Sequence, residues 1–394
     1  RLDDAGDVFA FAGGSDTPDV IQHHRNLMRR LFDGGFSGIC YPKKYGGQGL
    51  TFDHLRAFSE EALDYELPWL FANPTLCILA PTILDCGSEE QKQRHLPAIL
   101  KGEELWVQFL SEPSGGSDLA GVLTRATRDG EEFVITGSKI WTSGGHRADY
   151  AQAVVRTDWD APKHAGISVI IVPIPSDGLT IEPIKQVNGN SEFCQEFLDE
   201  VRVPASYVLG AENDGWNVTQ RMLYHEKLSL GGGSPYQLVL GQPRARGSRS
   251  EDDLVALARV SGKANDPHMR QLVAEGHISG LVQQALIGRV VTGMGTGKMP
   301  APASALLKLM GATTSIERSE LIMRLAGSRV AAWPDGSNGG AIGTGFLYRQ
   351  AIGILGGTNE IQRNIISERF LGMPRELAPD KGIPFKDVKR NTSA

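Results

Sequence analysis

Cysteine is scarce in this chain of 394 residues, which contains four, at scattered positions. No two of them form a Cys-x-x-Cys pair, so the sequence predicts neither structural zinc nor a disulfide scaffold, and it fits a reducing compartment. The nine histidines show no His-Glu-x-x-His or comparable spacing, and we predict no metal site. A Gly-x-Ser-x-Gly nucleophile elbow is absent as well.

An excess of positive charge is also lacking. The chain has 40 Lys and Arg against 46 Asp and Glu, a formal net charge of −6, which leaves no basic footprint for nucleic acid. The longest apolar stretch, Ile167 to Ile174, contains a Ser and a Pro and is far too short to span a bilayer, so we expect no membrane span. Because the chain begins at Arg1 rather than Met, a removed leader or a trimmed end stays open.

What is present suits a globular protein of two or three domains, with 41% hydrophobic and 22% charged residues. The first part of the chain reads as helices. Short β-prone runs follow, such as Phe133 to Gly137 and Ser168 to Val172, with turns rich in Gly, Pro and Asp between them. A helical pattern then returns. We predict an α+β multidomain chain with a helical N-terminal domain (1–105), a middle β domain (106–208) and a helical C-terminal domain (209–394).

Local signals fix some of these elements more closely. Ser88 and Gln91 form a capping box that opens a helix running towards Gly102. Segments 231–250 and 333–345 are rich in Gly, Ser, Pro and Arg, and we expect both to be loops. The glycines of segment 293–297 lack the P-loop pattern, and we predict a loop there too.

The most informative stretch runs from Gln108 to Asp118, Gln-Phe-Leu-Ser-Glu-Pro-Ser-Gly-Gly-Ser-Asp. A Pro turn followed by Gly115 and Gly116 lets backbone amides approach a ligand closely, because no Cβ stands in the way. Further on, Trp141-Thr142-Ser143 offers a flat indole and a hydroxyl near the end of a β run. Together the segments suit a flat, polar-edged, phosphate-bearing cofactor such as a flavin dinucleotide. The alternative is a surface turn plus a core Trp.

A second Gly-rich element begins with Gly356-Gly357-Thr358-Asn359-Glu360. Thr358 is a natural N-cap, and Glu360 in the first turn suits the positive end of the helix dipole. Two glycines leading into a helix leave amides that can bind a carbonyl oxygen, a phosphate or a flavin edge. The alternative is a plain capped helix.

Glu226 is a candidate general base. If residues 216–230 form one helix, its neighbours at three and four residues are Met222, Leu223, Ser229 and Leu230, none of which offers a salt bridge. Desolvation in a pocket would raise the pKa of this carboxyl and make it a better base near neutral pH. The alternative is an exposed Glu at the rim of the core. We interpret the adjacent His225 as a satisfied polar neighbour.

In this order, these segments make the chain resemble the acyl-CoA dehydrogenase family over nearly its whole length. The family's Thr-Glu-Pro-x-x-Gly-Ser-Asp motif stands here as Ser111 to Asp118, and its Gly-x-Lys-x-Trp element as Gly137 to Gly145. Phe197 to Pro204 resembles the Phe-x-x-Val-Arg-Val-Pro signature, and Gly357 to Asn364 the C-terminal one. The resemblance implies a helical N-terminal domain, a middle β-barrel or sandwich domain and a C-terminal four-helix bundle.

The resemblance also assigns roles. Trp141 would lie against the flavin of FAD, and the Ser143 hydroxyl would hydrogen-bond near N5. The Gly356 amide would polarise the thioester carbonyl of the substrate. The implied FAD contacts are Gln108, Leu110, Ser111, Gly116, Ser117, Trp141, Thr142, Ser143, Thr358, Asn359 and Glu360, and the implied substrate contacts are Ser117, Gly356 and Gly357.

The position of the catalytic base is inferred from a difference between this chain and many members of the family. Many relatives carry a catalytic Glu just before Gly-Thr, where this chain has Gly356. A second group places the base on an earlier helix within a Leu-x-x-Glu-Arg element, which Leu223 to Lys227 matches with Lys for Arg. The resemblance and the missing salt-bridge partner thus both point to Glu226.

The implied function is FAD-dependent α,β-dehydrogenation of an acyl-CoA thioester to the trans-2-enoyl-CoA. Electrons would pass to an electron-transferring flavoprotein. The resemblance implies a homo- or hetero-oligomer, a dimer of dimers, in the bacterial cytoplasm or a mitochondrial matrix. Two alternatives stay open: a flavin-poor subunit of a heteromeric acyl-CoA dehydrogenase, and an oxygen-using flavoenzyme of the same fold, an acyl-CoA oxidase or monooxygenase. The acyl group itself is not predicted.

Two departures concern the part of the cofactor site that neighbouring subunits share. The family's Arg-x-x-Phe element is not recognisable around residues 240–265, where Arg244 and Arg246 are only candidate stand-ins. Its Gln-x-x-Gly-Gly element is absent, with Leu325-Ala326-Gly327 near its place. Some actinobacterial relatives that act on steroid CoA thioesters form mixed tetramers with fewer flavins than subunits, and this chain could be such a subunit.

Overall fold

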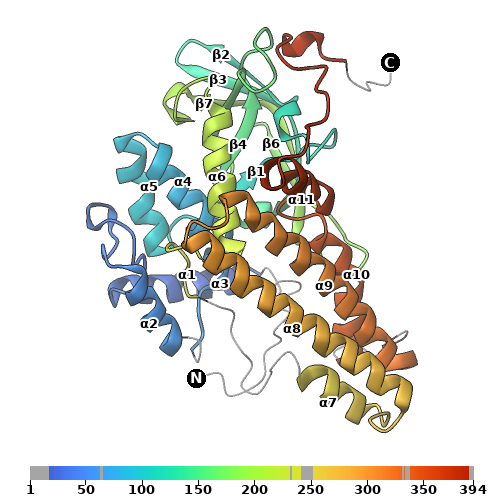
Figure 1. The fold of residues 1–394 in the computed structure, drawn as a ribbon. Coiled ribbons are helices and arrows are strands. Elements are labelled where there is room, and N and C mark those ends of the chain that lie inside the picture. The colour runs from blue at the N-terminus through green and yellow to red at the C-terminus, as the bar shows by residue number, and fades with distance from the viewer. Residues whose placement is uncertain are drawn as a thin grey trace.

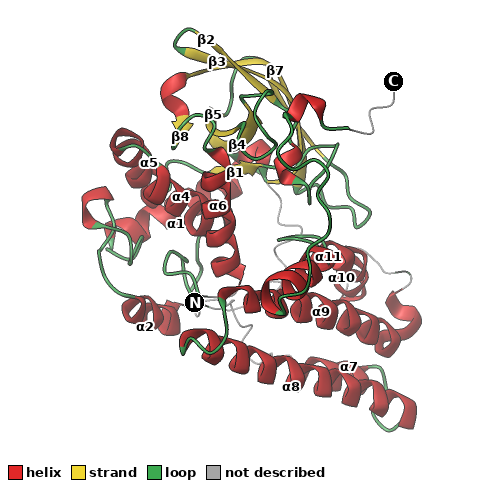
Figure 2. Ribbon diagram, turned by 45° about the horizontal axis from the view of Figure 1, so that its top comes forward, coloured by secondary structure: helices red, strands yellow, loops and turns green. Residues whose placement is uncertain are grey.

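The computed structural model describes residues 17–62, 65–230, 233–240, 252–330, 332 and 338–389. Helices come first along the chain, then the strands of one sheet, then helices again (Figure 1). The sheet lies at one end of the molecule, and the C-terminal helices α8 and α9 lie at the other (Figure 2). The predicted α+β architecture is confirmed, whereas the division at residues 105 and 208 stays a prediction.

The N-terminal region shows why its helices begin and end where they do. Ser88 Oγ accepts from the Gln91 amide over 3.1 Å, and Gln91 Oε1 accepts from the Ser88 amide over 3.0 Å, so the predicted capping box is confirmed. The same helix ends at Gly102, whose φ of 79° favours glycine and whose Cβ would come 2.7 Å from Met28. The helices are α1 (Pro18–Asp33), α2 (Phe52–Ala62), α3 (Trp69–Phe71), α4 (Ala80–Cys86) and α5 (Glu89–Lys101).

One helical segment of the described chain, Trp69–Cys86, is long and apolar enough to cross a membrane by length and composition. It comprises α3, a π-helical stretch and α4, and it packs against α6 and β1. Within the protein 56% of it is buried, and Phe71, Leu79 and Ile83 have no exposed surface. A buried core helix passes the same test. Two prolines and several polar residues interrupt its apolar run, so the sequence pattern alone does not mark it.

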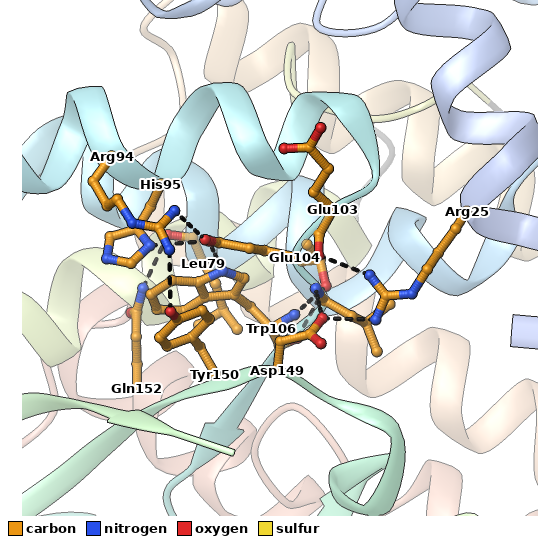
Figure 3. Close-up of polar contacts among 12 residues, drawn as sticks. Arg25, Leu79, Arg94, His95, Glu103, Glu104, Trp106, Asp149, Tyr150 and Gln152 are labelled. Atoms are coloured by element: carbon orange, nitrogen blue, oxygen red, sulfur yellow. Dashed lines mark hydrogen bonds and ion pairs between the residues drawn. The ribbon is translucent and has the colours of Figure 1, made fainter. Parts of the chain in front are cut away.

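A polar cluster joins α5 to strand β1 (Trp106–Phe109) and strand β4 (Tyr150–Arg156), as Figure 3 shows. The buried Glu104 carboxylate lies 2.7 Å from an Arg94 guanidinium nitrogen, 2.9 Å from His95 Nδ1 and 3.1 Å from Trp106 Nε1. Asp149 accepts from Arg25 and from the Leu105 amide, both over 2.7 Å. These bonds fix the start of β1, and therefore the segment that follows it.

The described strands form one eight-stranded sheet in the order β6-β7-β3-β2-β4-β5-β8, with β1 paired in parallel to β4. Strands β4 and β5 are buried along almost their whole length, and β7 alternates between buried and exposed residues. The β-prone runs of the middle region are confirmed as strands. The remaining strands are β2 (Arg125–Asp129), β3 (Glu132–Ser143), β5 (Ile167–Pro173), β6 (Leu179–Pro183), β7 (Phe193–Pro204) and β8 (Val208–Leu209).

The C-terminal helices correct two loop predictions. Residues 338–345 belong to α10, and residues 293–295 to the last turn of α8; Thr296 and Gly297 lie beyond it. Packing of α10 on α9 outweighs the poor helix propensity of its glycines. Residues 241–250, including Arg244 and Arg246, lie outside the described residues. The helices are α6 (Gly215–Leu230), α7 (Asp252–Val260), α8 (Pro267–Gly295), α9 (Ser304–Ala326), α10 (Asn338–Ile352) and α11 (Asn359–Ile365).

After α11 the chain returns to the sheet region. Phe385 is buried, and the Arg156 guanidinium carbon lies 3.7 Å from the centroid of the Phe385 ring. The Phe385 backbone amide donates to the Ala161 carbonyl over 2.9 Å. The Lys163 ammonium lies 2.7 Å from Asp118 and 3.0 Å from Asp380. The C-terminal segment therefore helps to hold the loop that ends the Gly-rich motif.

Candidate active site

The two segments singled out in the sequence, Gln108–Asp118 and Trp141–Ser143, lie side by side. The Ile140 amide donates to the Ser111 carbonyl over 2.9 Å. The Thr142 hydroxyl lies 3.3 Å from the Gln108 carbonyl oxygen. The chain that leaves β1 thus runs along the end of β3, and residues distant in sequence share one surface.

A β-bulge presents Trp141 to solvent. Ile140 pairs with Gln195 and Thr142 with Cys194 of β7, so Trp141 is the extra residue between two paired positions. Its φ of 67° is left-handed, a region that bulky residues rarely adopt. The residue is 54% exposed, and its ring meets Phe193 edge-on at 6.1 Å. The alternative of a core Trp is therefore wrong, and a strained, exposed indole indicates a ligand contact.

Trp141→Gly is expected to be more stable than Trp141→Ala, by about 1 kcal/mol. Glycine normally weakens a strand relative to alanine, but at a φ of 67° the alanine Cβ introduces strain that glycine lacks. Chemical denaturation of the two variants in cofactor-free form measures the difference. An alanine variant at least as stable as the glycine variant would show that the bulge does not impose this conformation.

The turn that follows Ser111 is open. Glu112 and Gly115 exchange backbone hydrogen bonds of 3.1 and 2.9 Å, which close the turn. A Cβ on Gly115 would meet nothing within 4 Å, and one on Gly116 would meet the Ser111 hydroxyl at 3.3 Å. Among the described residues, the Gly116 and Ser117 amides donate to no protein acceptor. Both amides are therefore available to ligand oxygens.

A buried ion pair anchors this turn. The Lys139 ammonium lies 2.8 Å from Glu112 Oε1, and the two side chains are 0% and 4% exposed. Lys139 also donates to the carbonyls of Val154 and Leu110, over 2.6 and 3.2 Å, and Glu112 accepts from two backbone amides, at 2.7 and 2.9 Å. Burial acts to raise the pKa of Glu112, but Lys139 and the hydrogen bonds outweigh it and hold the pKa below its usual value.

Glu226 lies on α6, which matches the helix predicted over residues 216–230. Its Oε2 accepts from the Gln108 side-chain amide over 3.4 Å, so it touches the first residue of the Gly-rich segment. The residue is partly buried, not freely exposed. Burial raises the pKa of its carboxyl, while the Gln108 hydrogen bond, Lys227 and Lys308 act in the opposite direction. A carboxyl in this state is suited to general-base chemistry.

The residue next to it serves the fold. His225 is buried, and its Nε2 lies 2.8 Å from Asp85 Oδ2. Arg221, one turn earlier, contacts the same carboxylate. The predicted satisfied polar neighbour therefore holds for Nε2 only, because His225 Nδ1 is buried and has no hydrogen-bond partner among the described residues.

The second Gly-rich element caps α11. Thr358 Oγ1 accepts from the Ile361 amide over 3.2 Å, so the predicted N-cap is confirmed. Gly356 and Gly357 have φ angles of 65° and 86°, and the buried Gln362 amide donates to both of their carbonyls over 3.3 Å. The carbonyls of both glycines are therefore engaged. Among the described residues their amides donate to no protein acceptor, so the amides are available to a ligand.

Asn359 and Glu360, the first two residues of α11, differ in their burial and in their partners. Asn359 Oδ1 is buried and has no hydrogen-bond partner among the described residues. Glu360 is exposed and lies 3.3 Å from Arg363. The first leaves an acceptor for a ligand donor, whereas the second already has a surface partner.

The described contacts do not bring residues 356–360 against Trp141 or Ser117. Lys308 on α9 relates the second Gly-rich element to Glu226. Its ammonium donates to the Ile352 carbonyl at the end of α10, shortly before that element, over 2.5 Å. Its charge also reaches Glu226, as the opposing influence on the pKa of that carboxyl shows. Burial lowers the pKa of Lys308 itself.

These residues fit a flat cofactor that carries phosphates. An exposed indole, two unused amides and the exposed Ser143 hydroxyl lie along one surface, and Asn359 supplies a buried acceptor. The Thr142 hydroxyl is directed inward to Glu196 Oε2, 2.9 Å away, so only the Thr142 backbone remains for a ligand.

Family models match three consecutive parts of the chain: acyl-CoA dehydrogenase, N-terminal domain, over residues 16–103; middle domain, over 108–201; and C-terminal domain, over 213–371. "Acyl-CoA dehydrogenase IpdE1" of Mycobacterium tuberculosis is 35% identical over 364 residues, which cover 91% of this chain and 90% of the relative. The chain belongs to the acyl-CoA dehydrogenase family.

Solved structures of acyl-CoA dehydrogenases agree with this assignment. One named "Tcur3481-Tcur3483 steroid ACAD" superposes with a TM-score of 0.75 and 33% identity, covering 90% of each chain. The ChsE4-ChsE5 complex from Mycobacterium tuberculosis gives a TM-score of 0.70 and 28% identity, covering 91% of this chain and 94% of the other. Acyl-CoA dehydrogenases are flavin-dependent oxidoreductases that act on acyl-CoA, so this chain is an enzyme of that class.

Sequence reasoning missed several residues of this acyl-CoA dehydrogenase site. The two-residue alternation from Phe133 places Lys139 on the buried face of β3, and the same alternation places Glu196 between Cys194 and Leu198 on the buried face of β7. The sequence alternation therefore indicates that both side chains are buried. Lys308 had no such signal, because its influence on Glu226 depends on where α9 lies relative to α6 in the folded chain.

Proposed function

We propose that this acyl-CoA dehydrogenase uses FAD to convert an acyl-CoA thioester into its trans-2-enoyl-CoA, with Glu226 as the base. The observation that carries the proposal is the contact between Glu226 and Gln108. It sets a partly buried carboxylate against the first residue of the Gly-rich segment, whose backbone carbonyl lies 3.3 Å from the Thr142 hydroxyl.

Glu226 would take the α-proton of the bound acyl-CoA, and its raised pKa suits the acceptance of that proton near neutral pH. The Gly356 and Gly357 amides would donate to the thioester oxygen and stabilise the enolate as it forms. FAD supplies the two-electron acceptor for the hydride that leaves the β-carbon. Loss of one proton and one hydride leaves the carbon–carbon double bond, so electrons and atoms balance.

The FAD contacts would be those implied by the family resemblance. Trp141 would cover the ring, the Ser143 hydroxyl would meet its edge, and the Gly116 and Ser117 amides would bind oxygens of the cofactor. Thr358, Asn359 and Glu360 would complete the set from the start of α11. The yellow colour of the purified variants reports how much flavin they retain. Loss of colour in Trp141→Ala and Gly116→Val, but not in Glu360→Ala, would show that the first two residues bind the cofactor and that Glu360 serves mainly its surface pair with Arg363.

Lys308→Met is expected to move the acid limb of flavin reduction to higher pH. Lys308 lowers the pKa of Glu226, so its removal raises that pKa, and a higher pH is then needed to ionise the base. Stopped-flow bleaching of the flavin by acyl-CoA across pH measures the shift. The exposed Lys298→Met serves as the control, and a Lys308→Met limb that stays in place or moves to lower pH contradicts the assignment.

We further propose a bulky, sterol-derived acyl group as the substrate. The support is the likeness to a structure named as a steroid acyl-CoA dehydrogenase. Anaerobic bleaching with straight-chain, branched and sterol-derived thioesters tests this. We expect bleaching by the sterol-derived thioesters and little by the straight chains; the reverse order contradicts it.

The electrons would pass to an electron-transferring flavoprotein. Reduced enzyme mixed with air distinguishes this from the oxygen-using alternative. Slow reoxidation by air and rapid reoxidation by the flavoprotein are expected; rapid reoxidation by air alone indicates an oxidase or monooxygenase. The expected compartment is the cytoplasm of a bacterium.

A second candidate function, a flavin-poor subunit of a heteromeric acyl-CoA dehydrogenase, is favoured by the two-protein names of the solved relatives. Exposed apolar side chains on two sides of α8 support association with another subunit. Purified alone, a yellow oligomer supports the catalytic chain, whereas a folded but colourless chain supports the subunit. The exposed α8 side chains are Ile278, Leu281 and Val282 on one side of the helix and Ile287 and Val291 on the other.

A further inference from the structure

A second buried carboxyl lies directly beneath the Trp141 bulge. Glu196 on β7 is 0% exposed, and its Oε2 is 2.9 Å from the Thr142 hydroxyl. Its Oε1 has no hydrogen-bond partner among the described residues, and it fits only because residue 145 is glycine: a Cβ there would come within 2.9 Å of it. Burial raises the pKa of Glu196 to about 7.

The groups around Glu196 leave it one polar partner. Lys139 faces it from β3 and lowers its pKa, but the Lys139 ammonium is bound to Glu112. From the turn after β3, His146 lies 3.2 Å from the Cys194 sulfur. On β6 the neighbour is the apolar Ile181, which is paired with it in the sheet. Thr142 therefore provides its hydrogen bond.

The Thr142 hydroxyl has one hydrogen and two acceptors. Glu196 Oε2 lies at 2.9 Å and the Gln108 carbonyl at 3.3 Å. When Glu196 is ionised it cannot donate, so the hydroxyl hydrogen goes to Glu196. When Glu196 is protonated, its own hydrogen is best placed on Oε2, where the Thr142 oxygen accepts it, because Oε1 faces no acceptor in the described chain. The Thr142 hydrogen then turns to the Gln108 carbonyl.

Gln108 carries this change to the catalytic base. Its backbone carbonyl receives or loses the Thr142 hydrogen bond, and its side-chain amide donates to Glu226 Oε2 over 3.4 Å. Two residues, Thr142 and Gln108, thus connect Glu196 to Glu226, and both belong to the segments that would hold the flavin.

We propose that Glu196 is a positioning residue for the flavin site, which acts through Thr142 and Gln108 on Glu226 and switches the Thr142 hydroxyl between two acceptors as it gains or loses its proton. The proposal rests on the proposed function, because it takes Glu226 as the base. In the protonated state the Gln108 backbone is anchored and Glu226 is held for the α-proton. In the ionised state that anchor is lost.

The first test follows the carboxyl itself and needs no substrate. Difference infrared spectra of the purified chain between about pH 6 and pH 8 should show a carboxylic-acid carbonyl band that disappears as the pH rises through about 7. Because Glu226 is a second carboxyl with a raised pKa, the spectra are recorded in the Glu226→Gln background, where the band should be present, should remain in Thr142→Val and should disappear in Glu196→Gln. A band that persists in Glu226→Gln combined with Glu196→Gln, or none in Glu226→Gln alone, overturns the proposal.

The second test follows the reaction. The rate of flavin reduction should fall about fivefold as Glu196 ionises, the effect of one neutral hydrogen bond. Glu196→Gln and Thr142→Val should both lose this fall in rate at higher pH and keep the acid limb that Glu226 sets. Glu182→Gln is the control: it removes an exposed carboxyl from the neighbouring strand β6 and should keep both features of the pH profile. Unchanged profiles in Glu196→Gln and Thr142→Val overturn the relay. If no thioester reduces the flavin, the proposed function fails, and the infrared result still decides whether Glu196 titrates.

Discussion

Glu226→Gln is expected to slow flavin reduction by acyl-CoA about a thousandfold, while the protein stays yellow. Glutamine keeps the size and the contact with Gln108 but cannot accept a proton. Because Glu226 belongs to none of the expected FAD contacts, flavin retention should be unaffected. Stopped-flow bleaching gives the rate, and the visible spectrum gives the flavin content.

The matched control is Glu212→Gln, which removes one carboxylate from the loop before α6, where it pairs with Arg128 at the surface. It should keep the parent rate. Loss of colour in Glu226→Gln would mean that the residue supports the cofactor site, and a rate within about tenfold of the parent would assign the base to another group.

Lys139→Met is expected to lower the free energy of unfolding by about 3–5 kcal/mol. The ammonium is fully buried, and its removal leaves the Glu112 carboxylate without its ion-pair partner in the core. Glu112→Gln should cost a comparable amount, because it strands the Lys139 charge. Equilibrium denaturation of each variant measures the loss.

The control for this pair is Arg202→Met, which breaks an exposed network with Asp129 and Glu132 on the same sheet and should cost about 1 kcal/mol at most. A Lys139→Met loss no larger than this would contradict the account. The pH dependence gives a second check. Since the pKa of Glu112 is held below its usual value, its contribution is present above the unfolded-state pKa and is lost as the pH falls through the folded one.

The sequence predicted most where the signal is local. The capping box at Ser88, the end of α5 at Gly102 and the N-cap at Thr358 follow from backbone groups that nearby side chains must satisfy. Glu226 stood out because no basic residue lies one turn away on its own helix. For the caps the sequence within one turn of the residue was sufficient, whereas the role of Glu226 also needed the family resemblance and stays a prediction.

Tertiary packing decided the rest. The left-handed φ of Trp141 follows from the register of β3 against β7, which no single strand encodes. The helix at residues 338–345 forms against the local preference of its glycines because it packs on α9. Strand alternation places Lys139 and Glu196 on buried faces, but the groups that they meet there depend on how β3 pairs with β7.

The most direct test of the account is exchange of the α-hydrogens of a bound acyl-CoA with heavy water, followed by mass spectrometry in the absence of an electron acceptor. The parent protein should incorporate deuterium at the α-carbon, and Glu226→Gln should incorporate none while still binding the thioester. Deuterium uptake at the parent rate in Glu226→Gln would show that another group removes the proton and would contradict the account.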